Sequence, residues 1–219
     1  MKVLLFGATG MIGQGVLREC LLDPRITEVR TLVRSPSGAT HPKLKEILHQ
    51  DYFDYRAIED QLTGLDACFF CLGVSSAGLS EEAYRRITHD LTLAAATLLC
   101  RLNPAMTFSY ISGAGADSSE QGHVMWARVK GQIENALLRL PFKAVYIFRP
   151  GAIRPLHGIT SRTPLYRILY RVLWPFLPLL KAISPDSLTT TEQLGRAMLH
   201  AGLGNLPSGV LEMRDINRL

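Results

Sequence analysis

The stretch that decides the fold is Gly7-Ala-Thr-Gly-Met-Ile-Gly13, which directly follows the apolar run Lys2-Val-Leu-Leu-Phe6. We expect a strand over Lys2–Phe6 and a helix over Met11–Leu22, with the glycine-rich loop as the turn between them. Glycines at this spacing permit a tight turn, a close approach of the backbone to a ligand and close packing of the helix on the strand. The free N–H groups of a helix N-terminus attract anions, so the loop predicts a site for the pyrophosphate of a dinucleotide.

The rest of the chain alternates short β-branched or aromatic runs with longer helical stretches, which is typical of a parallel sheet covered by helices on both faces. The expected strands are Lys2–Phe6, Glu28–Val33, Lys45–His49, Ala67–Leu72, Thr107–Ile111 and Ala144–Phe148. The expected helices are Met11–Leu22, Tyr55–Leu62, Glu81–Leu102 and Val124–Leu140. After Pro150 this alternation fades. We therefore predict an α/β fold, a Rossmann-type doubly wound parallel sheet over residues 1–150, with a small C-terminal cap at 151–219 in the same domain.

Composition narrows the class of protein. The chain has 219 residues, of which 47% are hydrophobic and 20% charged, so a disordered chain is excluded and a sizeable core is expected. No signal peptide and no transmembrane segment are visible, and the 4 cysteines suggest buried thiols, so we expect a cytoplasmic protein. Residues 142–186 carry seven basic and one acidic residue, a local charge of +6. Such a field favours an anionic small ligand, and no recognition motif indicates nucleic acid.

The end of the second expected strand bears on which dinucleotide would bind. A site specific for NAD usually places an acidic residue there, where it binds the ribose 2′-hydroxyl. Here that position holds Arg34, 21 residues beyond Gly13. A guanidinium suits a 2′-phosphate, so we expect NADP(H) in preference to NAD; a solvated surface arginine is the alternative. Asp51, just past the third strand, is expected either to meet the adenine amino group or to cap a turn.

Four further motifs, together with the glycine loop, carry a resemblance that runs from Lys2 to about Arg154. They are Cys71-Leu-Gly-Val-Ser75, Ile111-Ser-Gly-Ala-Gly-Ala-Asp117, Val129-Lys-Gly131 and Phe148-Arg-Pro-Gly151. The chain resembles the short-chain dehydrogenases/reductases, and more narrowly the atypical NADP(H)-binding branch with the Tat-interacting-protein oxidoreductases and bacterial epimerase-like proteins. The resemblance implies a serine–tyrosine–lysine catalytic set, in which Ser112 matches the serine and Lys130 the lysine. It also implies that the loop at Leu72 and Gly73 lies beside the cofactor.

The tyrosine of that set should stand four residues before the lysine, and Trp126 stands there instead. In the family, the tyrosine exchanges the substrate proton while the lysine binds the nicotinamide ribose and lowers the phenol pKa. An indole N–H only donates a hydrogen bond and is no acid near neutral pH. Lys130 is therefore expected to keep its ribose role while the proton-transfer role is vacant. Tyr84, Tyr110 and His123 are conceivable substitutes, but spacing selects none of them.

Taken together, the expected site has a cofactor part and a catalytic part. The residues expected to bind the cofactor are Gly7, Thr9, Gly10, Met11, Ile12, Gly13, Arg34, Asp51, Leu72, Gly73 and Lys130. The residues expected to be catalytic are Ser112, Trp126 and Lys130. No metal site is expected, because the histidines lack the spacing of metal ligands.

The sequence leaves the activity open between two classes of protein. The first is an atypical oxidoreductase or epimerase-like enzyme acting on a small molecule held between Ser112, Trp126 and the cap. The second is a non-catalytic protein that senses NADP(H) and passes the cofactor state to a partner. The missing tyrosine favours the sensor, and the retained serine and lysine favour the enzyme. A serine hydrolase using Ser75 is a weaker third reading, because the loop lacks the final glycine of a nucleophile elbow.

Two remaining features have structural readings. Cys68 and Cys71 have the spacing of a redox motif, but residues three apart on a strand point to opposite faces, so we expect core thiols. The aromatic-rich segment Pro164–Ile183 carries an apolar helical stripe. We expect it to pack on the main domain and cap the cleft; a homodimer contact and a peripheral membrane contact are the alternatives.

Overall fold

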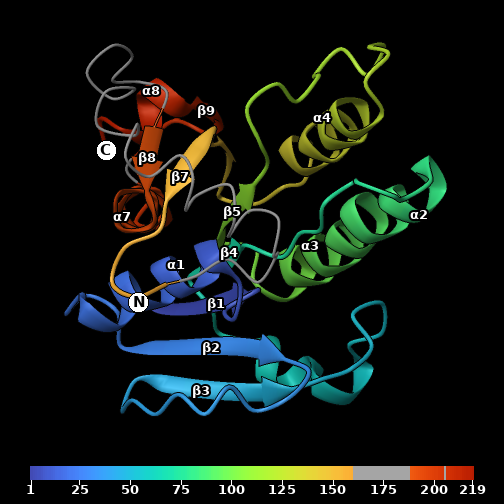
Figure 1. Ribbon diagram of the computed structural model, residues 1–219. Helices are drawn as coiled ribbons and strands as arrows, with labels where there is room; N and C mark the ends of the chain where they lie inside the picture. The colour runs from blue at the N-terminus through green and yellow to red at the C-terminus, as the bar shows by residue number, and fades with distance from the viewer. Residues whose placement is uncertain (160–187, 205) are drawn as a thin grey trace.

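The computed structural model describes residues 1–159, 188–204 and 206–219, and within these residues its centre is a seven-stranded parallel sheet (Figure 1). The strand order is β3-β2-β1-β4-β5-β6-β9, and every neighbouring pair is parallel. The strands are β1 Lys2–Phe6, β2 Glu28–Val33, β3 Leu44–Leu48, β4 Ala67–Phe70, β5 Thr107–Ile111, β6 Ala144–Arg149 and β9 Gly209–Glu212. A separate parallel pair is β7 Ala152–Arg154 and β8 Leu188–Thr190. The predicted doubly wound α/β fold is confirmed.

Helices cover both faces of the sheet. They are α1 Met11–Leu22, α2 Glu81–Arg85, α3 Leu91–Leu102, α4 Met125–Leu138, α7 Thr191–Gly202 and α8 Met213–Ile216, with the 3₁₀ segment η1 Arg56–Leu62 and the π segment η2 Arg86–Asp90. Figure 1 shows α3 and α4 on one side of the sheet and α1 and α7 on the other. Successive side chains of β1 point to opposite faces of the sheet and contribute to both hydrophobic cores. Leu4 and Phe6 pack with α3 and α4, while Val3 and Leu5 pack with α1 and α7.

The bounds of β3, α4 and β6 differ from the expected ones by one or two residues, and three further elements differ more substantially. The expected helix Tyr55–Leu62 is a 3₁₀ segment beginning at Arg56, and the expected helix Glu81–Leu102 is interrupted by the π segment η2. The expected strand Ala67–Leu72 ends at Phe70, because the chain leaves the sheet there to form the loop that lines the cleft. Hydrophobic periodicity does not distinguish α from 3₁₀ or π geometry over one turn, so the sequence could not predict the two helical differences.

The largest difference lies after Pro150, where the alternation was expected to fade. From Leu188 onward, strands and helices alternate again. Helix α7 packs beside α1 on the same face of the sheet, and β9 extends the main sheet beside β6. The α1–α7 contact depends on a glycine in each helix: a Cβ added to Gly15 would lie 2.6 Å from the Thr191 oxygen, and one added to Gly195 3.0 Å from the Gly15 oxygen. These glycines lower helix propensity, which is why α7 is hard to recognise in the sequence. The aromatic stretch Pro164–Ile183 lies outside the described residues.

Asn103 joins three segments beneath the sheet and provides a stability prediction. Its buried side chain accepts a hydrogen bond from the Leu65 N–H (3.0 Å) and donates to the Leu62 oxygen (2.8 Å). Asn103→Ala should lower the free energy of unfolding by about 1–3 kcal/mol, because two buried backbone groups lose their partner. Urea denaturation measures this. Asn135→Ala, which removes hydrogen bonds at a partly exposed site, is the matched control, and an equal loss in both variants would contradict the assignment.

Candidate functional site

A cavity of about 540 Å³ opens at the carboxyl ends of β1, β4, β5 and β6, the edge at which doubly wound sheets bind ligands. It gathers segments that lie far apart between residues 7 and 153 of the sequence. The lining residues are Gly7, Thr9, Gly10, Met11, Ile12, Arg34, Cys71, Leu72, Gly73, Val74, Ser75, Ile111, Ser112, Gly113, Trp126, Lys130, Pro150, Gly151 and Ile153. Of the residues expected from sequence, this set includes all except Gly13 and Asp51.

The glycine loop forms one wall of the cavity. Gly7 adopts a left-handed backbone with φ 75°, and a Cβ there would lie 2.7 Å from the Cys71 oxygen. Gly13 lies behind the loop, where a Cβ would lie only 2.0 Å from the Gly7 oxygen. Gly10 precedes α1 without any side-chain cap, so the first N–H groups of this helix have no capping oxygen. The loop thus presents backbone donors and no side-chain bulk, a cradle that suits a pyrophosphate.

The charge of the cavity wall is positive. Among the described lining residues the charged ones are Arg34 and Lys130, and no carboxylate is among them. Arg34 is exposed just past the end of β2, while its backbone oxygen accepts a hydrogen bond from the Gln50 side chain (2.5 Å). Asp51, in contrast, is exposed, and its carboxylate caps a turn by accepting from the Phe53 N–H (2.9 Å). The wall is therefore electrostatically suited to an anionic ligand.

Lys130 is fixed against the end of β5. Its Nζ donates to the Tyr110 hydroxyl (3.2 Å) and to the Ile111 oxygen (3.1 Å), and lies 4.9 Å from the centre of the Tyr110 ring. Burial lowers the pKa of Lys130 to about 8, and the nearby Glu134 carboxylate opposes part of that shift. Lys130 is thus rigidly held and close to losing its proton at a mildly alkaline pH.

Trp126 lies one turn before Lys130 on α4, as the sequence indicates, and it is half-buried in the cavity wall. A Cβ on Gly115 would lie 3.5 Å from the indole ring, so the glycine-containing loop 113–116 packs against its edge. The three conceivable substitutes for the missing phenol are not among the lining residues. Tyr84 and Tyr110 are buried, and burial raises the pKa of Tyr110 well above its usual value; His123 is exposed.

Two residues behind Ser112, Glu134 and Arg149, were not predicted from the sequence. The Ser112 Oγ donates a hydrogen bond to the carboxylate of Glu134, which is fully buried. Arg149 in turn forms an ion pair with Glu134 and a second one with Glu212 of β9 (3.0 Å). A signal was present, since Glu134 stands four residues after Lys130 on the same helix face, and Arg149 belongs to the Phe148-Arg-Pro-Gly151 motif.

Cys68 is a core thiol as expected, whereas Cys71 is partly exposed and also lines the cavity. Cys68 packs in the core beneath α3 and α4, and Cys71 packs against the core beneath α1 and α7. Both cysteines are free, and burial raises the pKa of both thiols. Neither is therefore a thiolate near neutral pH, the form that redox and nucleophilic chemistry requires.

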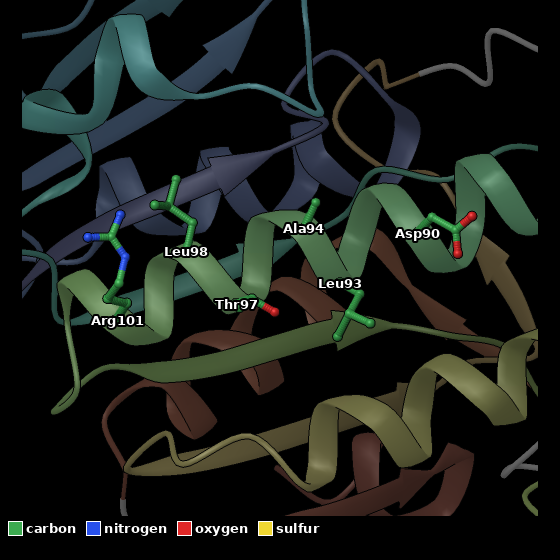
Figure 2. A pocket seen from close by; sticks show the side chains of 6 residues that line it. All are labelled: Asp90, Leu93, Ala94, Thr97, Leu98 and Arg101. Atoms are coloured by element: carbon green, nitrogen blue, oxygen red, sulfur yellow. The ribbon is translucent and has the colours of Figure 1, made fainter.

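A second cavity, of about 550 Å³, lies along α3. Figure 2 shows the side chains that line it. Its lining residues are Asp90, Leu93, Ala94, Thr97, Leu98 and Arg101. All six come from one helix and the residue before it, and they combine no nucleophile with a neighbouring base. The two cavities have similar volumes, but only the cavity at the strand ends has polar groups that converge on one point. We therefore take that cavity as the candidate functional site.

Comparisons with known proteins agree with this geometry. A family model described as NAD(P)H-binding matches residues 7–139. The protein fmp52, mitochondrial, of Emericella nidulans is 32% identical over 159 residues, which are 69% of this chain and 66% of that protein. The protein HTATIP2 of Rattus norvegicus is 26% identical over 155 residues, 69% of this chain and 62% of that protein. The matched regions thus span a little under two thirds of these two relatives.

Solved structures agree in fold at low sequence identity. An oxidoreductase of the short-chain dehydrogenase/reductase family from Burkholderia thailandensis superposes with a TM-score of 0.70 at 15% identity, covering 98% of this chain and 92% of that one. The Bordetella bronchiseptica enzyme WbmH, in complex with NAD+, superposes with a TM-score of 0.67 at 15% identity, covering 96% and 75%.

A parallel doubly wound sheet with a glycine loop and a cationic cleft at its switch point defines a dinucleotide-binding protein. The chain belongs to the NAD(P)H-binding family, and its fold is similar to that of a short-chain dehydrogenase/reductase. In the described part of the chain, none of the helices has the length and apolar character needed to cross a membrane.

Proposed function

We propose that the protein binds NADP(H) in preference to NAD(H) and acts as an oxidoreductase or epimerase-like enzyme on a small molecule. One observation carries this proposal: Arg34 lines the cavity at the end of β2, where a site specific for NAD has an acidic residue. The described cavity wall has no carboxylate that would repel a 2′-phosphate. Cytoplasmic location and a homodimer stay predictions, and the fungal relative named above is described as mitochondrial.

The residues present fit such a cofactor. Gly7 and Gly10 would lie under the pyrophosphate, Arg34 would bind the 2′-phosphate, and Lys130 would donate to the ribose next to the nicotinamide. When bound, the nicotinamide supplies or accepts a hydride. Thr9, Met11, Ile12, Leu72 and Gly73 would enclose it, and Asp51 caps its own turn instead of entering this wall.

The substrate would lie between Ser112 and Trp126, on the side of the cavity away from the glycine loop. Ser112 positions a substrate oxygen by a hydrogen bond, and Trp126 offers an apolar face and one N–H donor. The indole N–H of Trp126 donates a hydrogen bond but does not release its proton near neutral pH. The position that holds a general acid in the family therefore contributes only to substrate binding here. We therefore expect slow turnover, limited by proton transfer.

The second candidate function is a non-catalytic sensor of the NADP(H) state, and Trp126 is the observation that favours it. Binding of NADPH and NADH to the full chain, followed by NADPH oxidation with a panel of small ketones and aldehydes, separates the two. Steady oxidation supports the enzyme, and tight binding without turnover supports the sensor. Failure to bind either nucleotide would overturn both.

The pKa of Lys130 gives a pH-dependent prediction. The phosphates of NADPH are fully charged above pH 7, so protonated Lys130 should bind the anion more strongly than neutral Lys130. Since this lysine loses its proton near pH 8, the affinity for NADPH should fall as the pH rises from 7 to 9. The loss should be roughly 5-fold, the difference between a charge-assisted and a neutral hydrogen bond. Isothermal titration calorimetry at several pH values measures it.

Lys130→Met should bind NADPH more weakly at pH 7 and show a flat profile from pH 7 to 9. Lys143→Met is the matched control, because Lys143 is exposed at the opposite end of β6. This control should keep the parent profile. A parent affinity that does not change between pH 7 and 9 would show that the charge of Lys130 does not contact the cofactor.

A further inference from the structure

A buried chain of three side chains lies directly behind the cleft. Ser112 lines the cavity with 8% of its surface exposed, and its Oγ donates to Glu134 Oε1. Glu134 comes from α4, is fully buried and does not line the cavity. Arg149, at the end of β6, grips the same carboxylate with Nε at 3.2 Å from both oxygens and with Nη2. The proposed function uses Ser112 but assigns no role to Glu134.

The direction of the hydrogen bond at Ser112 is fixed by this arrangement. Arg149 has only donors, so it stabilises Glu134 as an ionised carboxylate, and an ionised carboxylate has only acceptors. A hydroxyl that contacts Glu134 must therefore donate its one proton to it. Reversing the bond would leave a buried negative charge facing the lone pairs of Ser112, which is strongly unfavourable.

With its proton committed to Glu134, Ser112 has only lone pairs to offer to the cavity. We infer that Glu134 is a positioning residue that makes Ser112 a hydrogen-bond acceptor toward the cleft, so that the ligand group held there is a hydroxyl donor and not a carbonyl oxygen. This inference rests on the proposed function only in taking Ser112 to face the ligand. The cleft is then selective for an alcohol or a sugar hydroxyl at this position.

Glu134→Gln tests the inference because it reverses the polarity with little change in size. The amide oxygen of glutamine would face Arg149, which keeps Glu212 and the Ser118 hydroxyl as partners, and the amide NH₂ would face Ser112. Ser112 would then accept from the amide, and its own proton would be free to point into the cavity. Ser112 should become a donor that prefers a carbonyl oxygen.

The probes are 1-methylcyclohexanol, a hydroxyl donor, and cyclohexanone, an acceptor of similar shape. Neither reacts in the presence of NADP+, because the tertiary alcohol has no hydride to lose and the ketone has none to receive. Dissociation constants are measured by ligand-observed NMR titration with the full chain saturated with NADP+. The parent should bind the alcohol roughly 2- to 10-fold more tightly than the ketone, the size of one hydrogen bond.

Three variants complete the experiment. Glu134→Gln should invert the preference, and Ser112→Ala should abolish it. Glu59→Gln, the same substitution at a glutamate that pairs with Arg101 away from the cavity, should keep the parent preference. A parent that prefers the ketone or treats both probes alike, no response included, overturns the inference. So does a folded Glu134→Gln variant with an unchanged preference.

A second measurement applies if Glu134→Gln does not fold. Neutron diffraction of the deuterated parent would locate the hydroxyl deuteron of Ser112. A deuteron directed at Glu134 supports the inference, and one directed into the cavity overturns it. If NADP+ fails to bind the parent, the proposed function fails, while the probe titration on the chain alone and the deuteron position still decide the polarity of Ser112.

Discussion

A Trp126→Tyr variant should reduce small ketones with NADPH faster than the parent, by up to roughly 10²–10⁴-fold, the usual contribution of a general acid. The substitution puts a phenol one helical turn before Lys130 in the cavity wall, where the phenol itself supplies the donor that a ketone oxygen needs. The positive charge of Lys130 would lower the pKa of that phenol and let it give a proton near neutral pH. The decrease in NADPH absorbance with a panel of ketones measures the gain.

Trp126→Phe is the matched control for this change, because it keeps an aromatic ring but adds no acid. It should stay at the rate of the parent. The contrary result is a parent that already turns over quickly and is slowed by the tyrosine. In that case another group supplies the proton, and the indole contributes through stacking or through the shape of the cavity.

Arg34→Ala should weaken NADPH binding about 10- to 150-fold and leave NADH binding nearly unchanged. Charge-assisted hydrogen bonds to a phosphate contribute about 1.5–3 kcal/mol, and 1.4 kcal/mol corresponds to tenfold in affinity. NADH lacks the 2′-phosphate, so it has nothing to lose at this position. Quenching of protein fluorescence during titration with each nucleotide provides both constants.

Arg25→Ala is the matched control for the loss of a surface arginine, because Arg25 is exposed and pairs with Asp23 instead of lining the cavity. It should leave both affinities as they are. An equal loss of NADPH and NADH affinity in Arg34→Ala would show that Arg34 contributes general attraction and does not distinguish the two cofactors.

The cofactor half of the cleft could be predicted because its signals are local in sequence. The glycine loop follows its strand at once, and the position of Arg34 is counted from it, so one strand–helix–strand unit contains the information. The strands β1, β2 and β5 were expected at the bounds that the structure shows. The apolar run Val3–Phe6 of β1 reflects burial on both faces of a parallel sheet.

The support behind Ser112 could not be predicted in the same way, because it depends on tertiary contacts. Glu134 shares a helix face with Lys130 and Arg149 belongs to a motif, but they come from different elements, so the sequence alone does not show that they meet behind Ser112. The same holds for α7, whose Gly195 is explained only by the helix that crosses it. Long-range packing thus determined what local propensity could not show.

The contact between Glu212 and Arg149 bears on how the chain can be truncated and how its C-terminal region can be exchanged between relatives. Glu212 lies seven residues from the end of the chain, yet it shares with Glu134 the arginine that supports Ser112. A fragment that keeps the nucleotide loop but lacks β9 would lose one of the two acids around Arg149. Recombination that exchanges the C-terminal region between relatives therefore changes a partner of the arginine that supports a serine one hundred residues upstream.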